Sequence, residues 1–158
     1  RYTQEQTHAT PPTKQLYHIE QFSQTLHDAS LMNSTLNQNT AIQDLFKRLH
    51  KPSLLFILSD FLEEVDLSLL SQKHEVIAII LRDRAEEVPK KLGEVTLSHP
   101  QDSKKIDTYF GQRSIEKYLA KLKENDEKLF EHFARYDIRS VKIFTDDEVV
   151  SKLVGLFV

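Results

Sequence analysis

The sequence contains no cysteine among its 158 residues. Disulfide bonds, thiolate metal ligands and a cysteine nucleophile are therefore excluded. A chain without disulfides suits a reducing compartment, and no charged start followed by a long apolar stretch and small residues marks a signal peptide. We therefore expect a cytoplasmic protein.

Glycine is also scarce, with three residues in the whole chain. The sequence has no Walker loop, no Gly-x-Gly-x-x-Gly turn and no Gly-x-Ser-x-Gly elbow. Each of these motifs needs glycines where the backbone turns sharply or approaches a phosphate. Phosphate binding by a glycine-rich loop is excluded within these residues. The seven histidines are not paired at metal-ligand spacing, so we interpret them as surface or structural residues.

The chain lacks both an excess of positive charge and a long hydrophobic run. Its 21 basic and 24 acidic side chains give a formal net charge of -3, which provides no field that attracts nucleic acid. The longest apolar runs are Leu54–Leu58 and Val76–Leu81, and both are far shorter than the roughly 20 residues that span a bilayer. We predict no nucleic-acid partner and no membrane span.

These two apolar runs are typical of β-strands buried on both faces of a sheet. Helical spacing of apolar residues over Phe61–Gln72 predicts the helix that a parallel crossover between them requires. Val141–Phe144 predicts a third strand, and Asp146–Leu156 predicts a final helix that begins with a capping box at Thr145. The result is a β-α-β unit with one further strand and helix.

Further helices are expected before and between these strands. The pattern predicts a connector over residues 1–14, a helix over Gln15–Ser30, a loop over Met32–Gln38 and a second helix ending before Pro52. A small hairpin-like insertion is expected within Asp83–Gly111. The helical stripe that starts at Ile115 and continues to Phe133 carries Asp126 on its apolar face, so we expect a kink or break near Asn125–Asp126.

The alternation predicts an α/β fold, with a Rossmann-like parallel sheet flanked by helices and a small insertion after the second strand. We expect one domain over residues 15–158. Only three strong strands are visible, whereas sheets usually hold about five or six. Either upstream sequence supplies further strands, or the open edge pairs with a second copy of the chain in a homodimer.

Polar residues follow each predicted strand. Because parallel strands end at one edge of a sheet, we expect an interaction rim there, formed by Ser59, Asp60, Asp83 and Asp146. With Thr40, the carboxylates could hold a divalent cation such as Mg²⁺. Ordinary structural roles compete with this interpretation: helix capping for Asp146 and Asp147, a loop salt bridge for Asp83, and a capping box from Thr40 to Gln43.

Several phrases resemble, in order, the bacterial family catalogued as domain of unknown function 58, whose members are von Willebrand factor A-like. The phrases are Pro11–Lys14, Ser53–Leu62, His74–Ile80, Asp83–Glu86, Val88–Pro89 and Gly93–Leu97. The resemblance extends over nearly all of the chain, from the first proline to Phe157. It implies the C-terminal part of a von Willebrand factor A-like domain.

The resemblance also implies a function. Members of this family are often encoded beside MoxR-type AAA+ ATPases and are thought to act with them in assembling or maturing protein complexes. In the metal-dependent adhesion site of von Willebrand A domains, Asp60 and Thr40 match two metal-binding positions. The Asp-x-Ser-x-Ser element of that site has no counterpart in the sequence. We therefore expect a protein-interaction module and not an enzyme. The alternative is a divalent-metal hydrolase or phosphatase that uses Asp60, Asp83 and Asp146.

Overall fold

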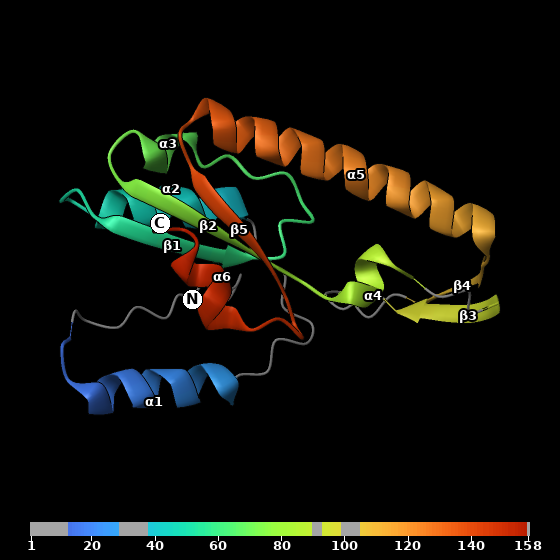
Figure 1. The fold of residues 1–158 in the computed structure, drawn as a ribbon, viewed down its shortest axis with the longest axis horizontal. Helices are drawn as coiled ribbons and strands as arrows, with labels where there is room; N and C mark the ends of the chain where they lie inside the picture. Colours follow the sequence, from blue (N-terminus) through green and yellow to red (C-terminus); the bar gives the residue numbers. More distant parts are fainter. Residues whose placement is uncertain (1–12, 29–37, 90–92, 99–104, 158) are drawn as a thin grey trace. The chain divides into compact units, whose positions relative to one another are not determined.

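Three parallel strands form the main sheet, as the sequence predicts. A computed structural model of the chain describes residues 13–28, 38–89, 93–98 and 105–157. The strands are β1 (Leu54–Ser59), β2 (Glu75–Arg82) and β5 (Arg139–Phe144), and they lie in the order β1-β2-β5 (Figure 1). Phe56 pairs with Ile77, and Ile79 pairs with Val141. All three carboxyl ends therefore lie at one edge of the sheet.

The chain divides into two compact units, residues 1–37 with 96–107 and residues 38–95 with 108–158. Helix α1 (Leu16–His27) belongs to the first unit and agrees with the predicted helix, although residues 29 and 30 lie outside the described part. The predicted hairpin is present as a two-stranded sheet of β3 (Gly93–Ser98) and β4 (Lys105–Phe110). Most of the predicted connector and loop, residues 1–12 and 32–37, lies outside the described residues.

Helices pack against both faces of the three-stranded sheet because alternate residues of a strand point to opposite sides. On one face, Val76, Ala78 and Ile80 form a core with α2 (Gln38–Arg48), α3 (Ser68–Ser71) and α5 (Gln112–Arg135). On the other face, Ile77 and Ile79 pack with side chains at the end of the chain, in and just after α6 (Val149–Val154). The fold is thus α/β, with the parallel sheet flanked by helices.

The helix predicted over Phe61–Gln72 is largely wrong, since only Ser68–Ser71 is helical. Residue Phe61 has a positive φ of 49°, which a helix cannot accommodate. Phe61 and Leu67 instead use their backbone groups in hydrogen bonds to α5. Tertiary hydrogen bonds thus replace the local ones that the apolar spacing suggested. The short helix α4 (Arg84–Glu87) follows β2 and was not predicted.

Three further expectations for the helices also need correction: the break in α5, the cap of α6 and the cap of α2. Helix α5 continues through Asn125 and Asp126 without a break, because both side chains bind neighbouring elements. Helix α6 begins at Val149 without a side-chain cap, and Thr145 instead hydrogen bonds to Asp83. Thr40 is the third residue of α2, so it does not occupy the N-cap position that the capping-box interpretation requires.

A buried histidine lies at the start of β2, and we expect it to make the stability of the fold depend on pH. Neither ring nitrogen of His74 has a hydrogen-bond partner among the described residues, and its side chain is buried. Burial lowers the pKa of His74, and the charge of Lys73 lowers it further. The unfolded chain therefore binds the proton more readily. The stabilisation is complete above the unfolded-state pKa and is lost as the pH falls toward the lowered folded-state pKa.

We expect His74→Leu to reduce the loss of unfolding free energy that wild type shows between pH 7.5 and pH 5. One proton limits that slope to about 1.4 kcal/mol per pH unit. Urea unfolding at several pH values measures it, and His50→Leu, at an exposed histidine, is the matched control. An unchanged slope in His74→Leu would contradict the assignment.

Among the described residues, no helix has both the length and the apolarity needed to cross a lipid bilayer.

Candidate functional site

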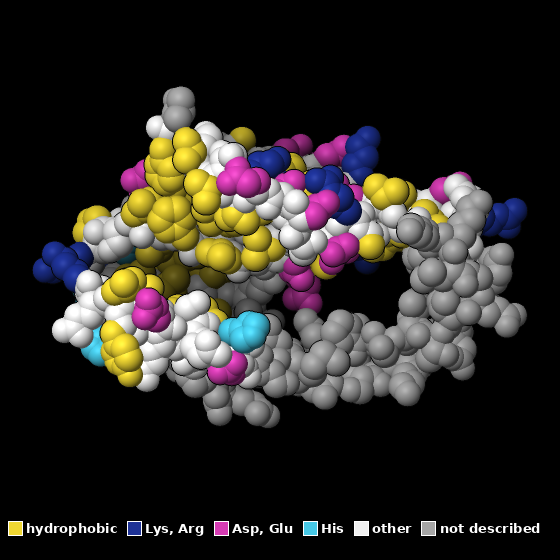
Figure 2. All heavy atoms as spheres, turned by 60° about the horizontal axis from the view of Figure 1, so that its bottom comes forward, with side chains coloured by type: hydrophobic (Ala, Val, Ile, Leu, Met, Phe, Trp, Pro, Cys, Tyr) yellow, Lys and Arg dark blue, Asp and Glu magenta, His cyan; other side chains and the backbone are white. Residues whose placement is uncertain are grey.

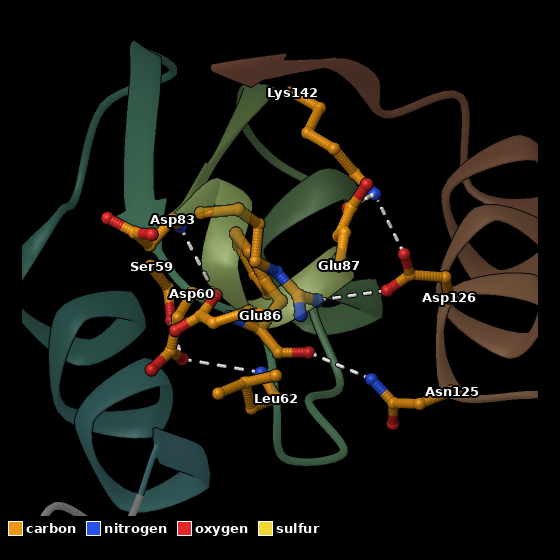
Figure 3. Close-up of polar contacts among 11 residues, drawn as sticks. Ser59, Asp60, Leu62, Asp83, Glu86, Glu87, Asn125, Asp126 and Lys142 are labelled. Atoms are coloured by element: carbon orange, nitrogen blue, oxygen red, sulfur yellow. Dashed lines mark hydrogen bonds and ion pairs between the residues drawn. The ribbon is translucent and has the colours of Figure 1, made fainter. Parts of the chain in front are cut away.

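The first part of the predicted rim is a turn after β1. The Ser59 hydroxyl accepts a hydrogen bond from Phe61 N at 3.2 Å, and Asp60 Oδ1 accepts one from Leu62 N at 3.3 Å. Such side-chain-to-backbone bonds stabilise a turn two residues ahead. Figure 3 shows the bond between Asp60 and Leu62, and both residues are exposed to solvent.

The second part is the start of α4 after β2, where Asp83 is the N-cap residue. Asp83 Oδ1 accepts a hydrogen bond from Ala85 N at 2.8 Å, and the Glu86 carboxylate accepts one from Asp83 N, completing a capping box. The Thr145 hydroxyl donates to Asp83 Oδ2 at 3.1 Å. Asp83 therefore caps a helix and connects the loops after β2 and β5. The interpretation of Asp83 as a loop salt bridge was wrong.

The third part is an ion cluster after β5, which replaces the predicted helix caps. Arg84 Nε lies 2.7 and 2.6 Å from the two oxygens of Asp146, and Arg84 Nη2 lies 2.9 Å from Asp147 Oδ1. Asp147 Oδ2 also accepts a hydrogen bond from Phe144 N at 3.0 Å, the main cause of its lowered pKa. Arg84 therefore joins α4 to the loop after β5.

A partly buried ionic network lies beside the rim and was not predicted. The Arg82 side chain is fully buried, and its Nη2 lies 2.9 Å from Asp126 Oδ1. Lys142 Nζ lies 2.9 Å from Asp126 Oδ2 and 2.6 Å from Glu87 (Figure 3). Burial lowers the pKa of Lys142, but hydrogen bonds to the two carboxylates outweigh it and the pKa is raised. The network links β2, β5, α4 and α5.

Helix α5 also holds both ends of the loop that follows β1. The Asn125 amide donates to the Phe61 carbonyl at 2.9 Å, and Leu67 N donates to His132 Nε2 at 3.0 Å. A groove of about 320 Å³ lies between this loop and α5. Its walls carry charges of both signs, among them Glu63, Glu64, Lys128 and Arg135.

The carboxylates of the predicted metal site do not form one cluster among the described residues. Within the described part of the chain, no group of three or more His, Asp or Glu side chains is placed to hold a metal ion. Asp83 and Asp146 bind a helix N-terminus and an arginine, respectively, and Asp60 stands in a separate turn. Metal binding by Asp60 and Thr40 stays a prediction.

Comparison with known proteins identifies the family. The family model described as "Protein of unknown function DUF58" matches residues 1–128. The chain belongs to the DUF58 family. No curated protein and no solved structure matches this DUF58 chain. The match includes the turn after β1, α4 and most of α5, so the first two parts of the rim lie within the matched residues.

Proposed function

We propose that this DUF58 chain is a protein-interaction module of von Willebrand factor A-like type, and that it binds its partner at the rim. The carrying observation is that hydrogen bonds and ion pairs fix all three loops at the carboxyl ends of the parallel strands, while Asp60 stays exposed. Loops held on a rigid scaffold bind partners without a large ordering cost.

The chemistry of this surface suits a protein partner. Next to the exposed Asp60 carboxylate, Leu62 is 40% exposed and offers an apolar contact. The groove beside α5 adds carboxylates, lysines and an arginine at its walls. Interfaces commonly combine an apolar contact with a charged periphery that sets specificity. By family resemblance, we propose a MoxR-type AAA+ ATPase as the partner, with a role in complex assembly or maturation.

We expect Asp60→Ala to weaken capture of the partner at least about tenfold, because Asp60 presents an exposed carboxylate on the rim. Affinity capture from the native bacterium identifies the ATPase. Binding of the purified ATPase to wild type and to Asp60→Ala then measures this effect. Glu127→Ala is the control, since Glu127 is 63% exposed on α5 and lies outside the groove lining. Recovery of no ATPase, or equal affinity of the two variants, would count against the proposal.

The alternative, a divalent-metal hydrolase or phosphatase, predicts a different response. Calorimetric titration with Mg²⁺ or Mn²⁺ would then show tight binding that disappears in Asp60→Ala. Arg84 neutralises Asp146, and Asp83 uses one carboxylate oxygen to cap α4. We therefore expect wild type to bind either cation only weakly.

A further inference from the structure

His132 on α5 binds the loop after β1 through a hydrogen bond that a proton would break. Its Nε2 accepts a hydrogen bond from Leu67 N at 3.0 Å, across 65 positions of the chain. A neutral imidazole accepts through one ring nitrogen and donates through the other, whereas the protonated ring only donates. The bond therefore requires neutral His132 with its proton on Nδ1, and protonation would set two donors against each other.

The Leu67 N–H needs an acceptor, because Leu67 is fully buried. A buried donor without a partner destabilises the conformation that buries it. The other end of the loop is tied to α5 differently, since the Asn125 amide donates to the Phe61 carbonyl and neither group titrates. Of these two ties, only the one at Leu67 depends on a proton.

A partner for the protonated ring lies close to His132. Asp66 Oδ1 is 3.7 Å from His132 Nε2, and it accepts a hydrogen bond from Ser68 N at 2.9 Å. Hydrogen bonds from Ser68 lower the pKa of Asp66, so Asp66 stays ionised through the pH range in which histidines titrate. A charged His132 can thus exchange the Leu67 N–H for the Asp66 carboxylate.

Other ionisable groups among the described residues lie near His132. They are Glu63 and Glu64 on the loop and Lys121, Glu124, Lys128, Glu131 and Arg135 on α5, which line the same groove, and Tyr136, whose ring centroid is 4.8 Å from that of His132. Acidic and basic side chains also lie side by side on the face of the chain drawn in Figure 2. Mixed charge therefore does not single out His132, whereas its bond to a buried N–H does.

We propose that His132 is a pH-dependent switch that holds and releases the loop after β1. Neutral His132 fixes Leu67 to α5, and protonated His132 turns to Asp66 and releases that end of the loop. The loop begins at the exposed Asp60, so its release loosens one of the three loops of the rim. The regulatory consequence, weaker partner binding at low pH, rests on the function proposed for the rim, whereas the switch itself needs no partner.

NMR of the chain alone tests the switch. At pH 7.5 we expect the His132 ring to carry its proton on Nδ1. Between pH 7.5 and pH 5.5, the protection of the Leu67 amide against hydrogen exchange, corrected for the intrinsic rate, is expected to fall at least about tenfold. The Ile138 amide is the internal reference, because it donates to the Phe133 carbonyl, which does not titrate. A proton on Nε2 at pH 7.5, or an equal fall at Ile138, would overturn the proposal.

Two variants separate the parts of the switch. His132→Gln keeps an acceptor for Leu67 N but does not titrate, so the pH dependence of Leu67 protection is expected to disappear. Asp66→Asn removes the carboxylate that receives the protonated ring and is expected to move the midpoint of the Leu67 change to lower pH, by roughly a few tenths of a pH unit. Glu127→Gln, at an exposed acid outside the groove lining, is expected to leave the midpoint unaltered. An unchanged pH dependence in His132→Gln, or equal midpoints in the two acid variants, would overturn the proposal.

Partner binding at the two pH values tests the consequence for the rim. Wild type is expected to bind the captured ATPase at least about fivefold more weakly at pH 5.5 than at pH 7.5, and His132→Gln is expected to change less. Equal changes in both chains would overturn control of the rim by His132. Recovery of no ATPase would instead count against the function proposed for the rim, because the NMR measurements decide the switch without a partner.

Discussion

Asp126→Ala is expected to lower the free energy of unfolding by about 3–5 kcal/mol, because it removes the partner of a buried cation. The Asp126 side chain is only 16% exposed and accepts hydrogen bonds from both Arg82 and Lys142. Nε and Nη1 of Arg82 have no acceptor among the described residues, so Asp126 provides the counter-charge for a fully buried guanidinium. Urea unfolding of the variant and wild type measures the loss.

The matched control is Glu127→Ala, one residue further along α5. Glu127 is 63% exposed and lies 3.7 Å from Lys123, one turn away on the same helix. Exposed pairs of this kind contribute about 0.3–0.5 kcal/mol, so the control is expected to lose no more than that. A similar loss in both variants would show that the Arg82 network is not structurally important. Asp126→Asn separates charge from shape, and we expect it to be less destabilising than alanine.

The parallel sheet could be predicted from the sequence because its signal is local. Val76–Leu81 is a continuous apolar run, and such runs suit strands covered on both faces. The three-stranded extent of the sheet within the described residues was also predictable, since three strong strands are visible in the sequence. The stretch Phe61–Leu67 was not, because its apolar spacing matches a helix while its backbone bonds join it to residues about 65 positions away.

The rim was predictable in its residues but not in their roles. Carboxylates after parallel strands must lie at one edge, and Asp60, Asp83 and Asp146 do so. Which one caps a helix depends on where α4 begins, and that short helix has no apolar periodicity. The ionic network had a detectable signal: Asp126 lies on the apolar face of α5, and Arg82 ends a buried strand. We interpreted Asp126 as a helix break, whereas an acid on a buried face also predicts a buried cation.

Phe133→Ala is expected to cost about 3–5 kcal/mol of unfolding free energy, because a large side chain is removed from the core. Phe133 is 2% exposed and contacts Phe61 edge to face, with ring centroids 5.7 Å apart. Phe61 lies next to Asp60 at a positive φ, so the cavity would loosen the turn that presents the rim.

Phe130→Ala makes the same chemical change three residues earlier on α5, where the side chain is 42% exposed. Among the described aromatic side chains its ring pairs only with Phe133, in a T-shaped arrangement with ring centroids 6.3 Å apart, so a loss of about 1 kcal/mol is expected. Urea unfolding of both variants at one pH gives the comparison. Because α5 anchors the loop after β1, Phe133→Ala should also weaken partner capture under folding conditions, and Phe130→Ala should not. Equal losses of stability would mean that Phe133 does not occupy the core between α5 and the sheet.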